Sequence, residues 1–388
     1  MNGPHTDDDD APLAGVRVVE FAQMVAAPSA ALLLADYGAD VVKVEPPEGD
    51  NCRNLRSAAA SALPVSPVFV AYNRGKRLIR LDLRDADSLA TAKRLVAAAD
   101  VVIEASRPGA MTRLGLGPEA AHALNPRLVY ASVSGFGWSE TVSDKRGVDL
   151  IVQAESGIMS MTGPAESPMK VGFTMVDAAT GHALCHAILA ALFRRERSGR
   201  GATVGVSLYD TALHLQSGPL VEYLMTGQQV PRSGNSAPLS APADLLRCGE
   251  GALVISAYLP AHWLRFIGLI GAPELAHDPR FAEVSGRLAH RAALIAELEA
   301  RLATRSAAAW QALLEPAGLL VGQVRDYAQV VDSPYTTAAA SIAPAGEAFG
   351  VHTPALLDGR ARGALDGLRE CRLEDIEWLR DEDLRSTS

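Results

Sequence analysis

Asp177 is the residue whose type and setting best suit nucleophilic chemistry. It follows the apolar stretch Val171–Val176 and begins the segment DAATGHALCHAILAALFRRER, which has helical periodicity and a basic end. A carboxylate at a helix N-terminus is held in its ionised form by the backbone amide dipoles, which suits attack on an activated carbonyl. Aspartate is also a favoured N-cap residue. The sequence therefore predicts Asp177 at the N-cap, where both roles can coexist.

Two glycines of the segment SGFG follow an apolar stretch that is typical of a strand. Because glycine has no side chain, the backbone N–H groups of Gly135 and Gly137 can come close to a reacting oxygen. Such donors stabilise the oxyanion of acyl transfer. A glycine turn that only ends a strand explains the pattern equally well.

Other chemical patterns are weaker. His182, Cys185 and His186 have a helical spacing that suits zinc, but their apolar surroundings favour a packed helix, so no metal site is predicted. The chain has no GxxxxGK[ST], HExxH or GxSxG motif. A GxGxxA match at residues 115–120 is interrupted by Pro118 and does not follow a strand directly, so we do not interpret it as a dinucleotide site.

Apolar strands alternate with helical segments over the first half of the chain. The expected strands are Val16–Phe21, Asp40–Glu45, Leu78–Leu83, Val101–Glu104, Leu128–Val133 and Thr203–Leu208. The expected helices are Pro28–Tyr37, Ser88–Ala98, a short one near Glu119, and Asp177–Arg197. This alternation predicts an α/β fold with a parallel sheet and helices on both faces.

A second, smaller unit is expected after a Gly-, Ser-, Asn- and Pro-rich linker at Thr226–Pro242. Its expected strands and helices are Ala252–Ala257, Ala261–Ile270, Arg291–Thr304, Ala307–Ala317 and Leu319–Val324. A closing helix is expected at Glu374–Arg380.

The composition is that of an ordinary folded protein, with 48% hydrophobic and 21% charged residues among 388. A net charge of -9 argues against a dedicated nucleic-acid binder. No apolar run reaches the ~18 residues of a membrane span, and the leader Met1–Asp10 is acidic where a secretory signal is basic. The four cysteines form no CxxC pair, so we expect a cytoplasmic protein with reduced thiols.

Basic side chains are concentrated between residues 43 and 113 although the chain is acidic overall. They are Lys43, Arg53, Arg56, Arg74, Lys76, Arg77, Arg107 and Arg113. A phosphorylated small molecule is one explanation, and scattered charges on a solvated surface are another.

Several longer motifs occur in a specific order along nearly the whole chain. They are PLAGVRVVEFAQMVAAP (12–28), LLADYGADVVKVEPPEGD (33–50), NRGKRLIRLDLR (73–84), RPGAMTRLGLG (107–117), NPRLVYASVSGFG (125–137), QAESG (153–157), SGRGATVGVSLYD (198–210) and LATRSAAAW (302–310). In order and spacing these motifs resemble the family III CoA-transferases, the carnitine and bile-acid CoA-transferase group.

The resemblance implies that CoA moves from a donor acyl-CoA to an acceptor carboxylic acid, with Asp177 as the nucleophile that becomes a CoA thioester. Coenzyme A is then a substrate, not a tightly bound cofactor. The family binds it on a Rossmann-like large domain. The corresponding positions here are Val25, Ala26, Tyr72, Asn73, Arg74, Gly75, Ala105, Ser106, Arg107, Arg113, Lys145 and Arg146. Arg113 and Arg146 are the leading candidates for phosphate recognition.

The sequence departs from the family pattern at three places. Pro46 stands where formyl-CoA transferases carry an adenine-side arginine, so Arg53 or Arg56 must substitute or the contact is absent. Val25 replaces an active-site glutamine of the formyl-CoA:oxalate enzymes, and residues 226–260 contain no glycine-run lid. The valine at position 25 and the absence of the glycine run both argue against oxalate and favour a larger acceptor acid.

A 2-methylacyl-CoA racemase is the main competing prediction. Racemases of this fold carry a histidine base in a Gly-His-Asp context, where this chain has Gly147, Val148 and Asp149. Without that second acid/base, proton transfer at Cα cannot operate as it does in those enzymes. A non-catalytic CoA-binding relative is the other alternative.

The resemblance also implies an interlocked homodimer with its active site between subunits. Residues 1–225 and 331–388 are expected to form the large domain, and residues 226–330 a smaller α+β domain. The expected partners are an acyl-CoA donor and a carboxylic acid acceptor, without nucleic acid or membrane.

Overall fold

The computed structural model describes residues 11–354 and 365–379, so the acidic leader lies outside the described residues. The chain forms two compact units. The large unit comprises Met1–Ile158, Val171–Gln228 and Pro334–Ser388, and the small unit comprises Met159–Lys170 and Gln229–Ser333. The segment Met159–Lys170 therefore joins the small unit, whereas the sequence analysis assigned it to the large domain.

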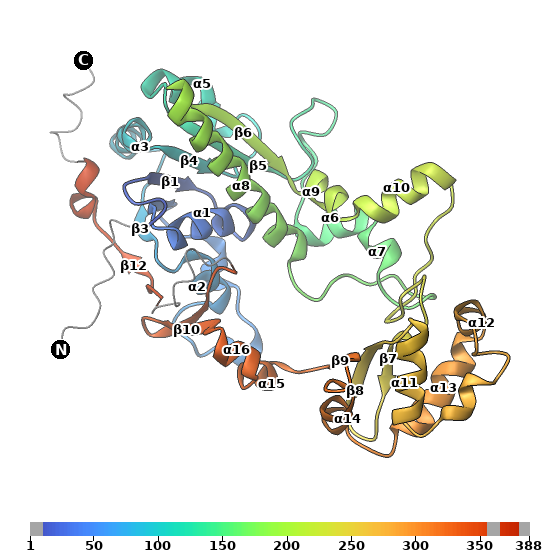
Figure 1. Ribbon diagram of the computed structural model, residues 1–388. Coiled ribbons are helices and arrows are strands. Elements are labelled where there is room, and N and C mark those ends of the chain that lie inside the picture. Colours follow the sequence, from blue (N-terminus) through green and yellow to red (C-terminus); the bar gives the residue numbers. More distant parts are fainter. Residues whose placement is uncertain (1–10, 355–364, 380–388) are drawn as a thin grey trace. The chain divides into compact units, whose positions relative to one another are not determined.

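A parallel sheet of seven strands forms the centre of the large unit, in the order β12-β3-β2-β1-β4-β5-β6 (Figure 1). The strands are β1 (Arg17–Phe21), β2 (Asp40–Glu45), β3 (Arg77–Arg80), β4 (Val101–Glu104), β5 (Val129–Ser134), β6 (Ala202–Ser207) and β12 (Arg369–Glu370). The central strands are nearly continuous apolar runs because helices cover both of their faces. The predicted α/β fold with a Rossmann-like sheet is confirmed.

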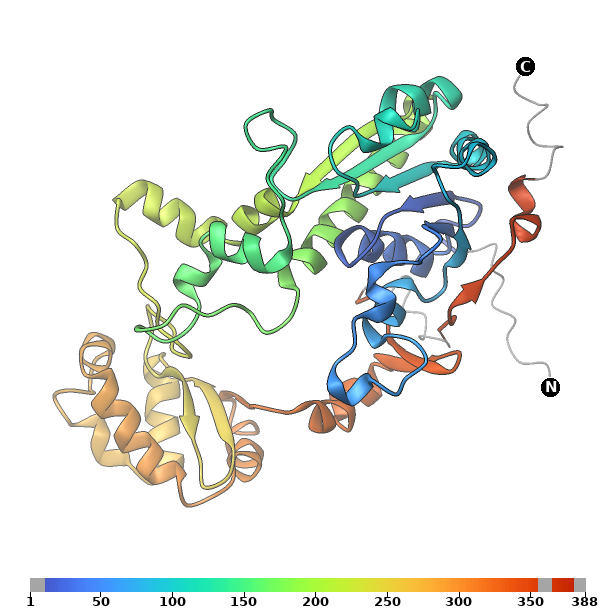
Figure 2. The same cartoon turned by 180° about the vertical axis from the view of Figure 1, so that it is seen from behind.

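Helices cover the two faces of this sheet in separate layers, which Figures 1 and 2 show from opposite sides. The helices α1 (Ala26–Asp36) and α8 (Met175–Ser198) share one apolar core with the sheet. The helices α3 (Ala86–Ala98) and α5 (Pro118–Leu124) belong to the core on the other face. Of the described helices, only α8 combines the length and apolar composition of a membrane span, and 44% of that apolar window is buried.

Local signals define where these helices begin and end. The carboxylate of Asp85 accepts a hydrogen bond from the backbone N–H of Ser88 and so caps α3. The helix α8 ends at Gly199, which adopts a left-handed conformation with φ of 67°.

The helices α1 and α8 approach each other closely because Gly181 has no side chain. A Cβ at Gly181 would lie 2.6 Å from the Cβ of Ser29 and 2.9 Å from the carbonyl oxygen of Ala26. This contact fixes the first turns of α8, which include Asp177, beside the beginning of α1.

Shorter elements complete the large unit. They are α2 (Pro67–Asn73), α4 (Ala110–Arg113), α6 (Asp149–Glu155), α7 (Ile158–Met161, which continues into the small unit), α9 (Leu208–Leu215), α10 (Ser217–Thr226), α16 (Pro334–Ala338), β10 (Ile342–Ala345) and β11 (Ala348–Val351). Single 3-10 turns lie at η2 (Asn51–Asn54) and η3 (Ala58–Ala60).

The small unit is an antiparallel sheet of three strands packed against helices. Its elements are β7 (Ala243–Arg247), β8 (Ala252–Ser256), α11 (Pro260–Leu269), η4 (Pro273–Ala276), α12 (Val284–Ala289), α13 (Arg291–Leu302), α14 (Ala307–Leu314), β9 (Leu320–Gln323) and α15 (Tyr327–Val331). Trp263, Phe266 and Trp310 lie in its core. The expected elements of this unit are present with small differences at their ends.

The last described segment differs from the sequence prediction. The expected helix Glu374–Arg380 is replaced by two 3-10 turns, η5 (Leu373–Asp375) and η6 (Glu377–Leu379), and Arg380 lies outside the described residues. A helix this short is not stable by itself, so tertiary contacts decide its conformation. Here the side chain of Trp378 is buried and donates a hydrogen bond of 2.8 Å to the carboxylate of Asp40.

Candidate active site

A cavity of about 560 Å³ opens at the carboxyl ends of β1, β4 and β5. The chain leaves β1 toward β2 on one side and leaves β4 toward β5 on the other, so the loops diverge between these two strands. In open α/β sheets, ligands bind in the crevice at such a switch point. The cavity is lined by Gln23–Ala27, Ala105–Pro108, Arg113, Val133–Gly137, Ser143–Val148, Asp177 and Leu208.

The structure brings most of the predicted site residues together in this cavity. The predicted residues in its lining are Asp177, Val25, Ala26, Ala105, Ser106, Arg107, Arg113, Lys145 and Arg146. All of them lie within the large unit. The binding of CoA by these residues stays a prediction.

The predicted residues Tyr72–Gly75 do not line this cavity. Asn73 is fully buried and accepts a hydrogen bond from the ammonium of Lys76. Arg74 is 2% exposed and forms a bidentate ion pair with Asp36, at 2.6 and 2.8 Å. Both side chains therefore hold the fold together, and the structure gives them no route to a ligand.

The segment Leu81–Arg84 is the part of this region that reaches a cavity. It follows β3 and lines a second hollow of about 360 Å³ together with Pro46. Gln23 and Ser106 line both cavities, so the two are adjacent. The sequence contained the signal for this segment, because residues after a parallel strand emerge at the binding edge of the sheet.

Basic side chains surround the larger cavity. Arg107, Arg113 and Arg146 are exposed, and in the part of the chain that the structure describes no carboxylate lies within ion-pair distance of them. Lys145 is different, because it contacts Glu155 at 2.9 Å and lies over the ring of Phe136. Guanidinium groups without protein partners are suited to bind phosphate or carboxylate groups.

The basic segment predicted around residues 43–113 is only partly a ligand surface. Lys43 and Lys76 are fully buried and paired with Glu20. Arg53 forms ion pairs with Glu45 and Glu370, and it does not line either cavity. For these side chains the structure does not favour the phosphate-binding explanation, because each of them is paired with a carboxylate of the protein.

Asp177 is the third residue of α8 and not its N-cap. The helix begins at Met175 and its N-cap is Thr174, which forms no side-chain capping bond. The preceding stretch Val171–Val176, which the sequence analysis interpreted as strand-like, forms no strand. The capping prediction for Asp177 is therefore wrong.

The cap of α8 comes from Asp149, at the start of α6. One carboxylate oxygen of Asp149 accepts hydrogen bonds from the backbone N–H groups of Val176, at 2.8 Å, and Asp177, at 3.2 Å. The other oxygen accepts a hydrogen bond of 2.5 Å from the amide of Gln153. Gln153 in turn accepts a hydrogen bond from the backbone N–H of Val171. This buried pair ties α6 to the segment that carries Asp177.

The carboxyl group of Asp177 is less acidic than the helix position suggests. Burial, together with the nearby charge of Asp149, raises the pKa of Asp177 from 3.8 to about 7. The expected stabilisation by the amide dipoles is not seen, because the first amides of α8 bind Asp149 instead. Asp149 is thus a functional residue that the sequence analysis used only as part of a motif.

The two glycines of SGFG lie in the wall of the cavity. The N–H of Gly137 donates to the hydroxyl of Ser134 at 2.9 Å, so it is occupied and the oxyanion prediction for this N–H is not supported. A Cβ at Gly135 would lie 2.7 Å from the backbone of Gly147. Gly135 therefore allows two loops of the wall to touch.

The candidate zinc residues on α8 do not form a metal site. Cys185 is buried in the apolar core, and burial raises its pKa to about 11. The rings of His182 and His186 lie 6.5 Å apart between their centroids. No group of three or more potential metal ligands occurs within residues 11–354 and 365–379.

The chain is similar to several known proteins over most of its length. A model of CoA-transferase family III matches residues 13–357. A probable fatty acyl-CoA transferase from Mycobacterium tuberculosis is 39% identical over 340 residues, which cover 85% of this chain and 86% of that protein. An acetyl-CoA:oxalate CoA-transferase from Acetobacter aceti is 36% identical over 351 residues, or 90% of each chain. The crystal structure of a CAIB/BAIF family protein from Brucella suis has a TM-score of 0.85 at 34% identity and covers 94% of this chain and 97% of that one.

Proposed function

Because this chain belongs to CoA-transferase family III, we propose that it moves CoA from an acyl-CoA donor to a carboxylic acid acceptor through a thioester on Asp177. The observation that carries this proposal is a carboxyl group with a raised pKa in a cavity at the switch point of the sheet. The lining of this cavity contains guanidinium groups that have no carboxylate partner within residues 11–354 and 365–379. The relatives described above, a probable fatty acyl-CoA transferase and an acetyl-CoA:oxalate CoA-transferase, support this assignment.

The proposed reaction begins when the carboxylate of Asp177 attacks the thioester carbonyl of the donor. The C–S bond breaks, CoA leaves as a thiolate, and Asp177 and the donor acyl group form a mixed anhydride. The thiolate then attacks the Asp177 carbonyl carbon, which releases the donor acid and leaves CoA bound to Asp177 as a thioester. The acceptor carboxylate repeats both steps in reverse and leaves as its CoA thioester.

The cavity fits the demands of these steps. Arg107, Arg113 and Arg146 are positioned to bind the phosphate groups of CoA, because they are exposed and free of carboxylate partners among the described residues. A carboxylate whose pKa lies near 7 is more basic and hence more nucleophilic than an ordinary aspartate, while about half of it remains ionised at neutral pH. Thioester energy is conserved, so the reaction needs no ATP.

Trapping of the intermediate tests this proposal. The protein is incubated with an acyl-CoA donor, treated with hydroxylamine or borohydride, digested, and analysed by mass spectrometry. We expect the modification on Asp177 and its absence in D177N. The matched control is D87N, because Asp87 also lies in the first turn of a helix but outside both cavities. Full turnover by D177N would exclude the covalent mechanism.

The position where racemases carry a histidine is occupied here by Val148, which lines the same cavity as Asp177. A valine side chain cannot donate or accept a proton, so we expect no exchange of the Cα hydrogen of a 2-methylacyl-CoA in heavy water. Proton NMR measures this exchange directly. Rapid incorporation of deuterium would favour racemisation over transfer.

The acceptor is identified by a panel of free acids with succinyl-CoA and acetyl-CoA as donors. Val25 lines the cavity at the position where the formyl-CoA:oxalate enzymes place a glutamine. We therefore propose that larger acids are preferred to oxalate. A higher kcat/KM for oxalate than for dicarboxylates of four or five carbons would contradict this preference.

A further inference from the structure

The loop between β1 and α1 forms one wall of the cavity that contains Asp177. Gln23, Met24 and Val25 all line this cavity. Met24 has a φ of 72°, a left-handed conformation that a residue with a side chain rarely adopts. Its side chain is 40% exposed, so packing of the side chain does not enforce the conformation. The backbone must be held by other groups.

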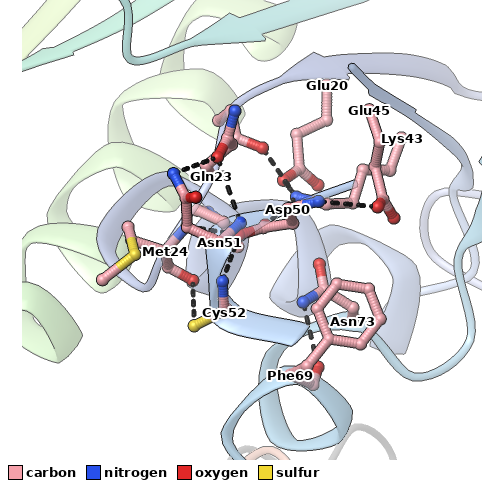
Figure 3. A network of polar contacts seen from close by, with 12 residues as sticks. Glu20, Gln23, Met24, Lys43, Glu45, Asp50, Asn51, Cys52, Phe69 and Asn73 are labelled. Carbon is pink, nitrogen blue, oxygen red and sulfur yellow. Dashed lines mark hydrogen bonds and ion pairs between the residues drawn. The ribbon is translucent and has the colours of Figure 1, made fainter. Parts of the chain in front are cut away.

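Hydrogen bonds to the segment Asp50–Cys52 hold this loop in place (Figure 3). One carboxylate oxygen of Asp50 accepts hydrogen bonds from the backbone N–H groups of Met24, at 3.3 Å, and of Cys52, at 2.8 Å. The thiol of Cys52 donates to the carbonyl of Met24 at 3.6 Å. The backbone and side-chain N–H groups of Asn51 donate to the side-chain oxygen of Gln23, at 3.2 and 2.9 Å.

Lys43 fixes the position of the Asp50 carboxylate. Its ammonium contacts Glu20 at 2.8 Å, the carbonyl of Ala22 at 2.6 Å and the second oxygen of Asp50 at 2.9 Å. The contacts with Glu20 and Ala22 are hydrogen bonds, and the contact with Asp50 is an ion pair. Lys43 and Glu20 are fully buried, and Asp50 is 1% exposed. The Lys43–Asp50 pair therefore binds two backbone groups of the loop, the carbonyl of Ala22 and the N–H of Met24, which lie on either side of Gln23.

The charges of this network are maintained by their mutual contacts. Burial opposes ionisation of Glu20, but Lys43 and Lys76 outweigh it and keep the pKa of Glu20 below its ordinary value. Burial likewise opposes the charge of Lys43, but Glu20 and Asp50 outweigh it and raise the pKa of Lys43. Removing one partner of such a buried pair leaves an uncompensated buried charge, so the pair is sensitive to substitution.

The network lies within electrostatic reach of the proposed nucleophile. Burial raises the pKa of Cys52 to about 11, and the carboxylates of Asp50 and Asp177 add to this effect. Met24, which this segment holds, and Asp177 line the same cavity.

We propose that Asp50 is a positioning residue: its carboxylate, fixed by Lys43, keeps Met24 left-handed and so shapes the cavity wall beside Asp177. The inference rests on the proposed function, because it assigns the wall a role in CoA transfer. Asp50 does not itself line the cavity. It acts only through the backbone of Met24.

The variant D50N is the direct perturbation because asparagine has nearly the same shape. If the amide oxygen of the new side chain faces Lys43, its NH₂ group faces the N–H donors of Met24 and Cys52. Donors then oppose donors, and Met24 loses the bond that holds its conformation. Glycine adopts a left-handed conformation without strain, so M24G removes the need for that bond.

A double-mutant cycle of D50N and M24G separates positioning from a general structural role. We expect D50N to lower kcat/KM about tenfold in the native background and less than about threefold in the M24G background. A structural role would lower kcat/KM equally in both backgrounds. Equal losses, or no loss in D50N, would overturn the proposal. Circular dichroism and melting temperature establish that each variant is folded.

Amide hydrogen–deuterium exchange gives a readout that does not depend on turnover. We expect faster exchange at residues 22–25 in D50N, with little change elsewhere in the large unit. The matched control is D244N, because Asp244 is also 1% exposed and paired with a basic residue, Arg291, but belongs to the small unit. Unchanged exchange at residues 22–25 would contradict the proposed contact.

A second series covers the case in which D50N does not fold. Met24 is exposed enough that M24L and M24V should fold, and both keep an apolar side chain. A β-branched residue tolerates the left-handed conformation worst, so M24V should lose about tenfold more kcat/KM than M24L. Equal activities would exclude a role for this conformation. If D177N stays active while the cycle shows coupling, the covalent mechanism fails and the positioning of the wall stands.

Discussion

Two carboxyl groups, Asp149 and Asp177, meet at the first turn of α8, and only one of them binds the helix amides. Burial, together with the nearby charge of Asp149, raises the pKa of Asp177 to about 7. Only the ionised carboxylate can attack a thioester, so kcat/KM should fall about tenfold per pH unit below that value and level off above it. The measurement is a profile of kcat/KM from pH 5 to 9. A flat profile across this range would contradict ionisation of Asp177 as the controlling step.

The variant D149N should move this profile to lower pH. Burial remains, but the charge that adds to the pKa of Asp177 is removed. D87N again serves as control, because it removes a first-turn carboxylate from α3 instead. A shift of the midpoint separates an electrostatic role for Asp149 from a loss of helix capping, since lost capping lowers the maximal rate without moving the midpoint. An unmoved midpoint would contradict the electrostatic role.

The raised pKa of Asp177 predicts that this residue, which the proposed reaction requires, lowers the stability of the fold at neutral pH. The pKa of Asp177 is about 7 in the folded chain against 3.8 ordinarily, so its ionisation destabilises the fold progressively as the pH rises between these values. D177N carries no such charge. We expect D177N to melt at a higher temperature than the native chain at pH 8, and this difference to shrink at pH 4. Thermal denaturation by calorimetry measures it, and a difference that does not depend on pH would refute the linkage.

The sequence identified Asp177 from local pattern, but it could not identify what surrounds Asp177. The capping carboxylate of Asp149 lies 28 residues earlier in the chain, and no local motif connects the two. The same limit applies to Lys43 and Lys76. Their positive charges are evident from the sequence, but their pairing with the buried carboxylate of Glu20 is not. Pairings between distant residues decide such cases, and they follow from the tertiary structure.

The close packing of α1 on α8 makes Gly181 a sensitive position. G181A would place a methyl group 2.6 Å from Ser29 and force the two helices apart. We expect a net destabilisation of about 1–3 kcal/mol, although alanine favours a helix by about 1 kcal/mol, and a loss of turnover because Asp177 moves with α8. The control G268A lies in α11 with open space around its Cα, so it should be neutral or stabilising. Urea denaturation and kcat/KM measure both effects, and similar results for the two variants would contradict the packing argument.

Buried strands of the parallel sheet were predicted well, but one apolar stretch outside the sheet was not. The strands Asp40–Glu45 and Val101–Glu104 have the predicted bounds, because buried parallel strands are continuous apolar runs. The stretch Val171–Val176 is equally apolar but pairs with no strand, because Gln153 and Asp149 bind its backbone from α6. Apolar composition alone does not distinguish these two environments.

An exposed apolar helix suggests how the whole molecule assembles. No residue of α10 is buried, and Leu224 and Met225 are 72% and 81% exposed. Apolar surface of this kind marks an interaction site. We predict a homodimer, measured by sedimentation velocity. The double variant L224E/M225E should shift it toward monomer, whereas E222Q on the same helix should not. A monomeric native protein at micromolar concentration would contradict the prediction.

The edge strand β12 has a consequence for how the protein is made. It pairs with β3, which precedes it by most of the chain, including the entire main segment of the small unit. At translation rates of roughly 5–20 residues per second, the edge of β3 stays unpaired for tens of seconds before β12 is synthesised. An unpaired strand edge invites wrong partners during that interval. The nascent chain should therefore depend on chaperones, and a stop codon just before Arg369 should yield aggregates in place of a soluble, shortened enzyme.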